Sequence, residues 1–235
     1  MGILTNLIGS TLAEFMLEGR GPHKVNLKEF WDESVSRMYA EMQVSNRISN
    51  VTKEMLGGKK STFYNLSRCK AAELRHLVPV ILEVLRRLDT GSDRDGHRIL
   101  AFEHIAGCLD VVHKSRLFLS TQEHTTLTDR YSRFLKHYHV LRELAVGRGR
   151  KLYNLTFKFH ALIHTVAYAK WCNPSAHWCY GFEDFMGKVV TAAQSCSHAT
   201  PPRLVGRKVL ENYRLALHLQ MQRSLLPLLC SSAGS

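Results

Sequence analysis

The stretch STQEHTTLTDRYSRFLKHYHVLREL, from Ser120 to Leu144, decides the fold class. Ser120 followed three residues later by Glu123 matches the capping box that begins a helix. Large apolar residues then recur every three or four positions, which is the spacing of one buried helical face: Leu127, Tyr131, Phe134, Leu135, Tyr138, Leu141 and Leu144. The pattern predicts a long helix with one side in a hydrophobic core.

Other parts of the chain share this helical spacing. Residues 70–88 and 97–119 have it, and the second of these leads directly into Ser120, so an antiparallel helix pair is expected. Strand signals are poor, because the only Asp-Gly dipeptide, Asp95-Gly96, lies between helices. We predict an all-α (mainly α) fold, an irregular multi-helix bundle with a brief extended segment near residues 153–156.

Glycine and proline suggest how the chain divides. Gly19, Gly21 and Pro22 end a short first helix, which predicts an N-terminal arm over residues 1–25. The tract GRGRK at 147–151 would then separate two parts and leave a short tail. We expect a helical bundle at 26–150, a basic, His- and aromatic-rich helical region at 151–225, and a flexible tail at 226–235.

Composition limits the cellular setting and the class of partner. Lysine and arginine total 32 against 20 acidic residues, so the formal charge of +12 favours a polyanion such as DNA. The N-terminus lacks a basic leader, and no run reaches the roughly 18 apolar residues of a membrane span. We therefore expect an intracellular chain without a membrane partner, nuclear if the source is eukaryotic, with reduced cysteines.

The basic residues of the last third predict a nucleic-acid-binding face. Lysine and arginine exceed acidic residues there, and Trp171, Trp178 and Tyr180 are available to stack on bases. An equally weighted alternative is a solvated surface over an aromatic core. The candidate phosphate ligands are Arg148, Arg150, Lys151, Lys158, Lys188, Arg203, Arg207 and Lys208.

Four residues form a candidate metal site. His160 and His164 are four apart, which places both imidazoles on one helical face, and Cys172 and Cys179 follow. Zinc accepts such a mixed set, but the separation of the two cysteines is not that of a zinc finger. We favour the alternative, in which the histidines pack in the bundle and the cysteines are small buried apolar groups.

Glu183 is the one candidate catalytic residue. With Asp184 it stands at the start of an expected helix, where negative charge is favoured by the helix dipole, so a structural role is available. A catalytic role would make it a ligand for Mg²⁺ in phosphoryl transfer, which needs two or three converging carboxylates. No partner carboxylate can be nominated from the sequence, and we leave open whether the chain is an enzyme.

The order of these features resembles the helical C-terminal region of CACTA-type DNA transposases. The resemblance covers about residues 70–190, and its matching positions are Lys158, His160, His164, Trp178, Glu183, Phe185 and Gly187. It implies a late helix whose glutamate, Glu183 here, completes a metal-binding acidic triad in an RNase H-like core. The upstream strands of that core are missing, so the resemblance implies a fragment or a partner chain that supplies them.

These observations lead to three expectations for function. The first is a transposon-derived helical domain that associates with DNA and is not catalytically autonomous. The second is a helical scaffold or protein-interaction module without nucleic-acid binding. The third is a metal-dependent nuclease or transposase fragment.

Overall fold

The computed structural model describes residues 2–18, 26–57, 63–177, 190–191, 193–196 and 200–231. Within those ranges the chain is all-α and contains no strand, which confirms the predicted fold class. The chain forms two compact units, residues 1–177 and 178–235, and each is described by itself.

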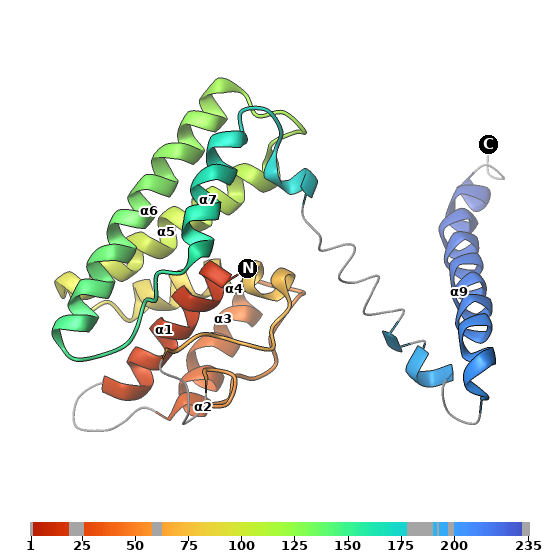
Figure 1. Ribbon diagram of the computed structural model, residues 1–235, viewed down its shortest axis with the longest axis horizontal. Helices are drawn as coiled ribbons and strands as arrows, with labels where there is room; N and C mark the ends of the chain where they lie inside the picture. Colours follow the sequence, from red (N-terminus) through yellow and green to blue (C-terminus); the bar gives the residue numbers. More distant parts are fainter. Residues whose placement is uncertain are drawn as a thin grey trace. The chain divides into compact units, whose positions relative to one another are not determined.

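An antiparallel pair of long helices is the centre of the first unit (Figure 1). The pair consists of α5 (Asp93–Lys114) and α6 (Thr121–Gly147). The expected capping box begins α6: the Glu123 amide donates to Ser120 Oγ over 3.2 Å, and the Ser120 amide donates to Glu123 Oε2 over 2.7 Å. Most of the predicted apolar face is buried: Leu127, Tyr131, Phe134, Tyr138 and Leu141.

Two further helical segments pack beside this pair. Helix α4 (Ala71–Arg87) buries the apolar face expected from its spacing and lies against α5. The chain after Asn26 forms a continuous succession of α2 (Leu27–Phe30), the π-helical turn η1 (Trp31–Val35) and α3 (Ser36–Glu41).

The N-terminal arm is a wrong prediction, because helix α1 (Gly2–Glu18) lies in the core. Leu7, Ile8 and Leu12 are fully buried, and the Leu66 amide donates to the Thr5 carbonyl over 2.9 Å. The glycines and proline that follow in the sequence predict the end of this helix, but they do not predict whether the helix packs in the bundle.

The expected boundary near residue 150 is also wrong, because the chain beyond it continues in the same core. Residues 151–156 form an irregular connection without a strand, and Tyr153 has a left-handed φ of 53°. Its buried ring packs edge-to-face on Tyr138, with centroids 5.7 Å apart. Helix α7 (Phe157–Tyr168) then lies along α6, and the short 3-10 helix η2 (Pro174–His177) ends the unit.

The second unit is described mainly through α9 (Pro202–Ser231). Residues 226–231, expected to begin a flexible tail, continue this helix, and residues 232–235 lie outside the described part of the chain. No helix among the described residues is both long and apolar enough to span a bilayer.

Candidate functional site

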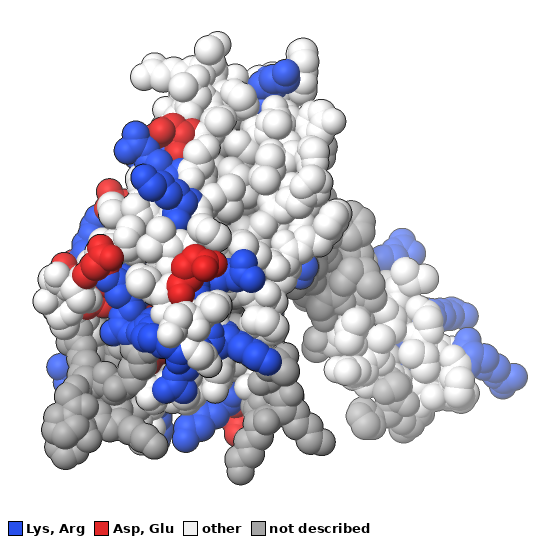
Figure 2. All heavy atoms as spheres, turned by 60° about the vertical axis from the view of Figure 1, so that its left-hand side comes forward, with Lys and Arg blue, Asp and Glu red and all other residues white. Residues whose placement is uncertain are grey.

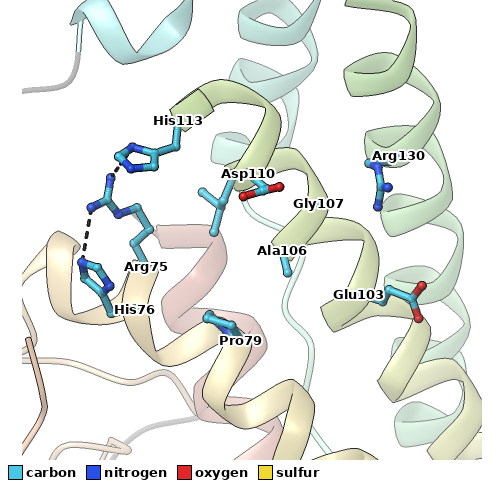
Figure 3. Close-up of a pocket in the computed structure, with 10 residues that line it drawn as sticks. Arg75, His76, Pro79, Glu103, Ala106, Gly107, Asp110, His113 and Arg130 are labelled. Atoms are coloured by element: carbon cyan, nitrogen blue, oxygen red, sulfur yellow. Dashed lines mark hydrogen bonds between the residues drawn. The ribbon is translucent and has the colours of Figure 1, made fainter. Parts of the chain in front are cut away.

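A pocket of about 430 Å³ lies where α4, α5 and α6 approach one another (Figure 3). It combines basic, acidic and small side chains. Its walls are Arg75, His76 and Pro79 of α4, Glu103, Ala106, Gly107, Leu109, Asp110 and His113 of α5, and Arg130 of α6.

Arg75 holds two histidines of this pocket. Its guanidinium lies 3.4 Å from His113 Nδ1 and 3.3 Å from His76 Nε2 (Figure 3). Because a guanidinium only donates, both of these ring nitrogens act as acceptors in these contacts. Burial, together with the nearby charges of Arg75 and His113, lowers the pKa of His76. An anion bound beside the His76 ring would favour its protonation and so act against this lowering of its pKa.

Arg130 is positioned by a glycine on the neighbouring helix. A Cβ at Gly107 would overlap the Arg130 guanidinium, so the missing side chain makes room for it against α5. Among the described residues Arg130 forms no hydrogen bond or ion pair. Figure 3 shows Arg75 and Arg130 coming from α4 and α6, on opposite sides of α5.

The two carboxylates of the pocket have basic partners outside its walls. Glu103 lies 3.5 Å from Arg86 Nη2, and Asp110 lies 2.7 Å from Lys114 Nζ. Each carboxylate therefore has a cationic partner that does not line the pocket, although both pairs are exposed and screened by solvent. The pocket lining also contains two guanidiniums and two imidazoles. These groups are hydrogen-bond donors of the kind that bind anions.

Arg148, which was predicted to contact phosphate, forms an ion pair with the buried side chain of Glu14. Its guanidinium donates to Glu14 Oε1 over 2.8 Å and to the Leu144 carbonyl over 2.9 Å. Glu14 is 1% exposed, so this contact compensates a buried charge. The sequence spacing could not show this, because Glu14 and Arg148 come together only through the packing of α1.

The other predicted phosphate ligands divide between the two units. Arg150, Lys151 and Lys158 are exposed in the first unit. In the second unit Arg203 is exposed, Arg207 pairs with Glu211 over 2.8 Å, and Lys208 donates to Thr200 over 3.2 Å. Lys188 lies outside the described residues. Figure 2 shows more Lys and Arg than Asp and Glu on the viewed face.

The candidate metal ligands are described in part. His160 and His164 lie on one face of α7 as predicted, with their Nε2 atoms 3.0 Å apart. They are exposed rather than packed in the bundle, contrary to the favoured alternative. Cys172 is half-buried, while Cys179 lies outside the described residues. In the described ranges no three His, Cys, Asp or Glu side chains are grouped to hold a metal ion.

A second histidine cluster, which the sequence reasoning missed, lies between α5 and α6. His97 Nδ1 is 2.8 Å from His137 Nδ1, and the His104 ring stacks on His137 with centroids 5.6 Å apart. The seven-residue spacing of His97 and His104 was a signal for a shared face. Burial lowers the pKa of both His104 and His137.

The catalytic prediction, Glu183, lies outside the described residues together with its neighbour Asp184. Its role and its Mg²⁺ remain predictions. The basic pocket was missed because its residues are up to 55 positions apart in the sequence. The nearest local signal was the Arg75-His76 pair, which lies off the apolar face of the helix at 70–88.

The chain was also compared with known proteins. No family model, no curated protein and no solved structure matches it.

Proposed function

We propose that this chain binds DNA through the phosphate backbone, with the pocket between α4, α5 and α6 as its main described phosphate contact. One observation carries the proposal. Arg75, Arg130, His76 and His113 line a single hollow, and the two carboxylates in that hollow are paired with Arg86 and Lys114.

The overall charge supports the same partner. A formal charge of +12 attracts a polyanion over long range, and Arg150, Lys151 and Lys158 add exposed cations in the same unit. The resemblance to CACTA-type transposases favours DNA among the possible polyanions. We propose that the chain is a transposon-derived domain without autonomous catalysis, because no converging carboxylates can be assigned to Glu183.

Salt dependence of binding is the first test. Each neutralised phosphate releases condensed counterions, so log K should fall with log salt by about 0.9 per contact. We expect fluorescence anisotropy with a labelled duplex of random sequence to show a steep fall in affinity as salt increases. Absence of binding at low salt would contradict the proposal and favour the scaffold function.

Two charge-removing variants test the pocket. Arg75→Gln and Arg130→Gln should each weaken duplex binding about tenfold at low salt, because a charge-assisted hydrogen bond is lost. Each should also reduce the salt slope by about 1. Arg133→Gln is the matched control: it removes the same charge from α6, but Arg133 is exposed and bonded to Asp129 over 3.0 Å. An equal loss in the control would assign binding to net charge rather than to the pocket.

Gly107→Ala tests the same site without changing charge. The new Cβ would displace the Arg130 guanidinium, whose flexible side chain can move. Duplex binding should weaken while the thermal midpoint stays the same or increases, since alanine is favoured over glycine inside a helix by up to about 1 kcal/mol. Unchanged binding with Arg130 displaced would remove Arg130 from the site.

A further inference from the structure

Helix α7 has two apolar sides, and only one of them is covered within the described chain. The inner side carries Phe159 and Val166, which are 5% and 7% exposed. It is tied to α6 by the Tyr131 hydroxyl, which donates to the Phe159 carbonyl over 3.1 Å, and by His124 Nε2, 3.1 Å from the Val166 carbonyl.

The outer side of α7 is exposed although it is rich in large apolar residues. Phe157 is 79% exposed and Tyr168 66% exposed on this side, and Trp171, in the turn that follows the helix, is 67% exposed. A helix that is apolar on both sides is normally buried on both, and large exposed apolar residues on a helix whose other side is already covered are a feature of interaction surfaces. This outer face extends from Phe157 to Tyr168.

The spacing on the outer face is that of a helix-pairing seam. On α7, His164 follows Phe157 at an interval of seven, and the exposed His160 and Ala167 lie three residues after each of them. Alternating intervals of three and four place side chains in a line along which a second helix can pack.

The two histidines of this seam are already arranged as chelating ligands. Their Nε2 atoms are 3.0 Å apart and their ring centroids 4.6 Å apart. Two nitrogens bound to one tetrahedral zinc ion at about 2.05 Å are about 3.3 Å apart, so a few tenths of an ångström of movement suffices. His160 and His164 provide two of the four ligands that such an ion takes.

A second copy of the chain can supply the other two zinc ligands. In a twofold-symmetric pair of helices the same patch meets itself, so a second copy presents an identical His160–His164 pair at the axis. We propose that two copies of this chain associate through the outer face of α7 and hold one Zn²⁺ between their histidine pairs. The aromatic residues on either side of the histidines would be buried in the contact. This inference is independent of DNA binding.

Metal-dependent mass is the test. Sedimentation equilibrium of the full chain should give the monomer mass in EDTA and twice that mass with Zn²⁺. Metal analysis should show that His164→Ala loses half a zinc ion per chain and stays monomeric with Zn²⁺. His139→Ala is the matched control, since His139 is an exposed histidine on α6 and is not on the outer face. It should dimerise like the native chain.

Phe157→Ser separates the apolar contact from the metal. Phe157 is highly exposed, so folding should be unaffected, and the dimer dissociation constant with Zn²⁺ should rise at least tenfold. A monomer that keeps one zinc ion per chain would overturn the proposal, because the ion would then be completed within one chain. Dimerisation of His164→Ala with Zn²⁺, or an unchanged dissociation constant for Phe157→Ser, would overturn it as well.

Discussion

Glu14 and Arg98 form an ion pair of 2.9 Å in the interior, with side chains 1% and 3% exposed. The same carboxylate accepts a hydrogen bond of 2.6 Å from the Tyr153 hydroxyl and one of 2.8 Å from Arg148. These contacts connect α1, α5 and the chain after α6. A buried charge is tolerated only when it is paired and hydrogen-bonded, and Glu14 meets both conditions.

Glu14→Gln should therefore destabilise the chain strongly. The substitution keeps the size of the side chain but removes the buried charge that faces the Arg98 guanidinium, which then has only Asp95, 2.8 Å away, as a carboxylate partner. Breaking a buried pair in this way costs about 3–5 kcal/mol. Urea denaturation followed by circular dichroism measures the change.

Glu41→Gln is the control for that experiment. Glu41 pairs with Arg87 over 2.6 Å, but both side chains are at least half exposed. Solvent screens this pair, so the unfolding free energy should stay within error of the native value. Equal effects of the two substitutions would contradict a special role for burial at Glu14.

Gly9→Ala should disrupt the packing of α1 against residues 65–66. A Cβ at Gly9 would overlap backbone atoms of Asn65 and Leu66, which cannot move as a flexible side chain can. We expect a loss of about 1–3 kcal/mol, as for other overpacked core sites. Gly96→Ala in α5 meets open space and should instead stabilise by up to about 1 kcal/mol. Thermal unfolding of both variants checks the opposite signs.

Asn173→Ala should loosen the end of α5. The buried Asn173 side-chain amide donates to the carbonyls of Val112, Ser115 and Arg116 over 3.0, 3.2 and 2.9 Å. Carbonyls at the end of a helix have no intrahelical partner, and leaving a buried one unsatisfied costs about 1–3 kcal/mol. Asn173→Asp should cost more, because a carboxylate would face these carbonyls. If both variants unfold like the native chain in urea, Asn173 is not a cap.

The histidines between α5 and α6 predict a loss of stability in mild acid. Burial lowers the pKa of His104 and His137 below the usual 6.5, so the unfolded chain takes up protons at a higher pH than the folded chain. The free energy of unfolding is therefore not reduced by these two histidines above pH 6.5, and it decreases as the pH falls below that value. Denaturant midpoints between pH 7 and pH 5 should show this slope.

His137→Gln should flatten that slope, and His139→Gln, at an exposed position on the same helix, should not. Carboxylates affect stability only at lower pH. Hydrogen bonds from Ser115 and Ser120 lower the pKa of Glu123 from 4.5 to about 2. The stability that this charged carboxylate contributes is therefore lost only as the pH falls below 4.5. An unchanged slope in His137→Gln would show that this histidine does not titrate on unfolding.

Local patterns were sufficient for the helices but not for their assembly. The Ser120–Glu123 box and the apolar face of α6 were predictable, because helix signals are encoded within a few residues. The packing of α1 in the core was not predictable, because Gly19, Gly21 and Pro22 predict the end of a helix whether or not that helix packs in the core. The role of Arg148 depended on that placement.

By itself the sequence determined an all-helical fold, a basic surface charge and a pair of histidines on one face of α7. Only the tertiary structure decided that Glu14 is buried with Arg98, that Arg75 and Arg130 share a pocket, and that the outer face of α7 stays exposed. The reason is physical. Helix formation depends on neighbours three and four residues apart, whereas burial and charge pairing depend on which helices meet, and packing sets that over the whole chain.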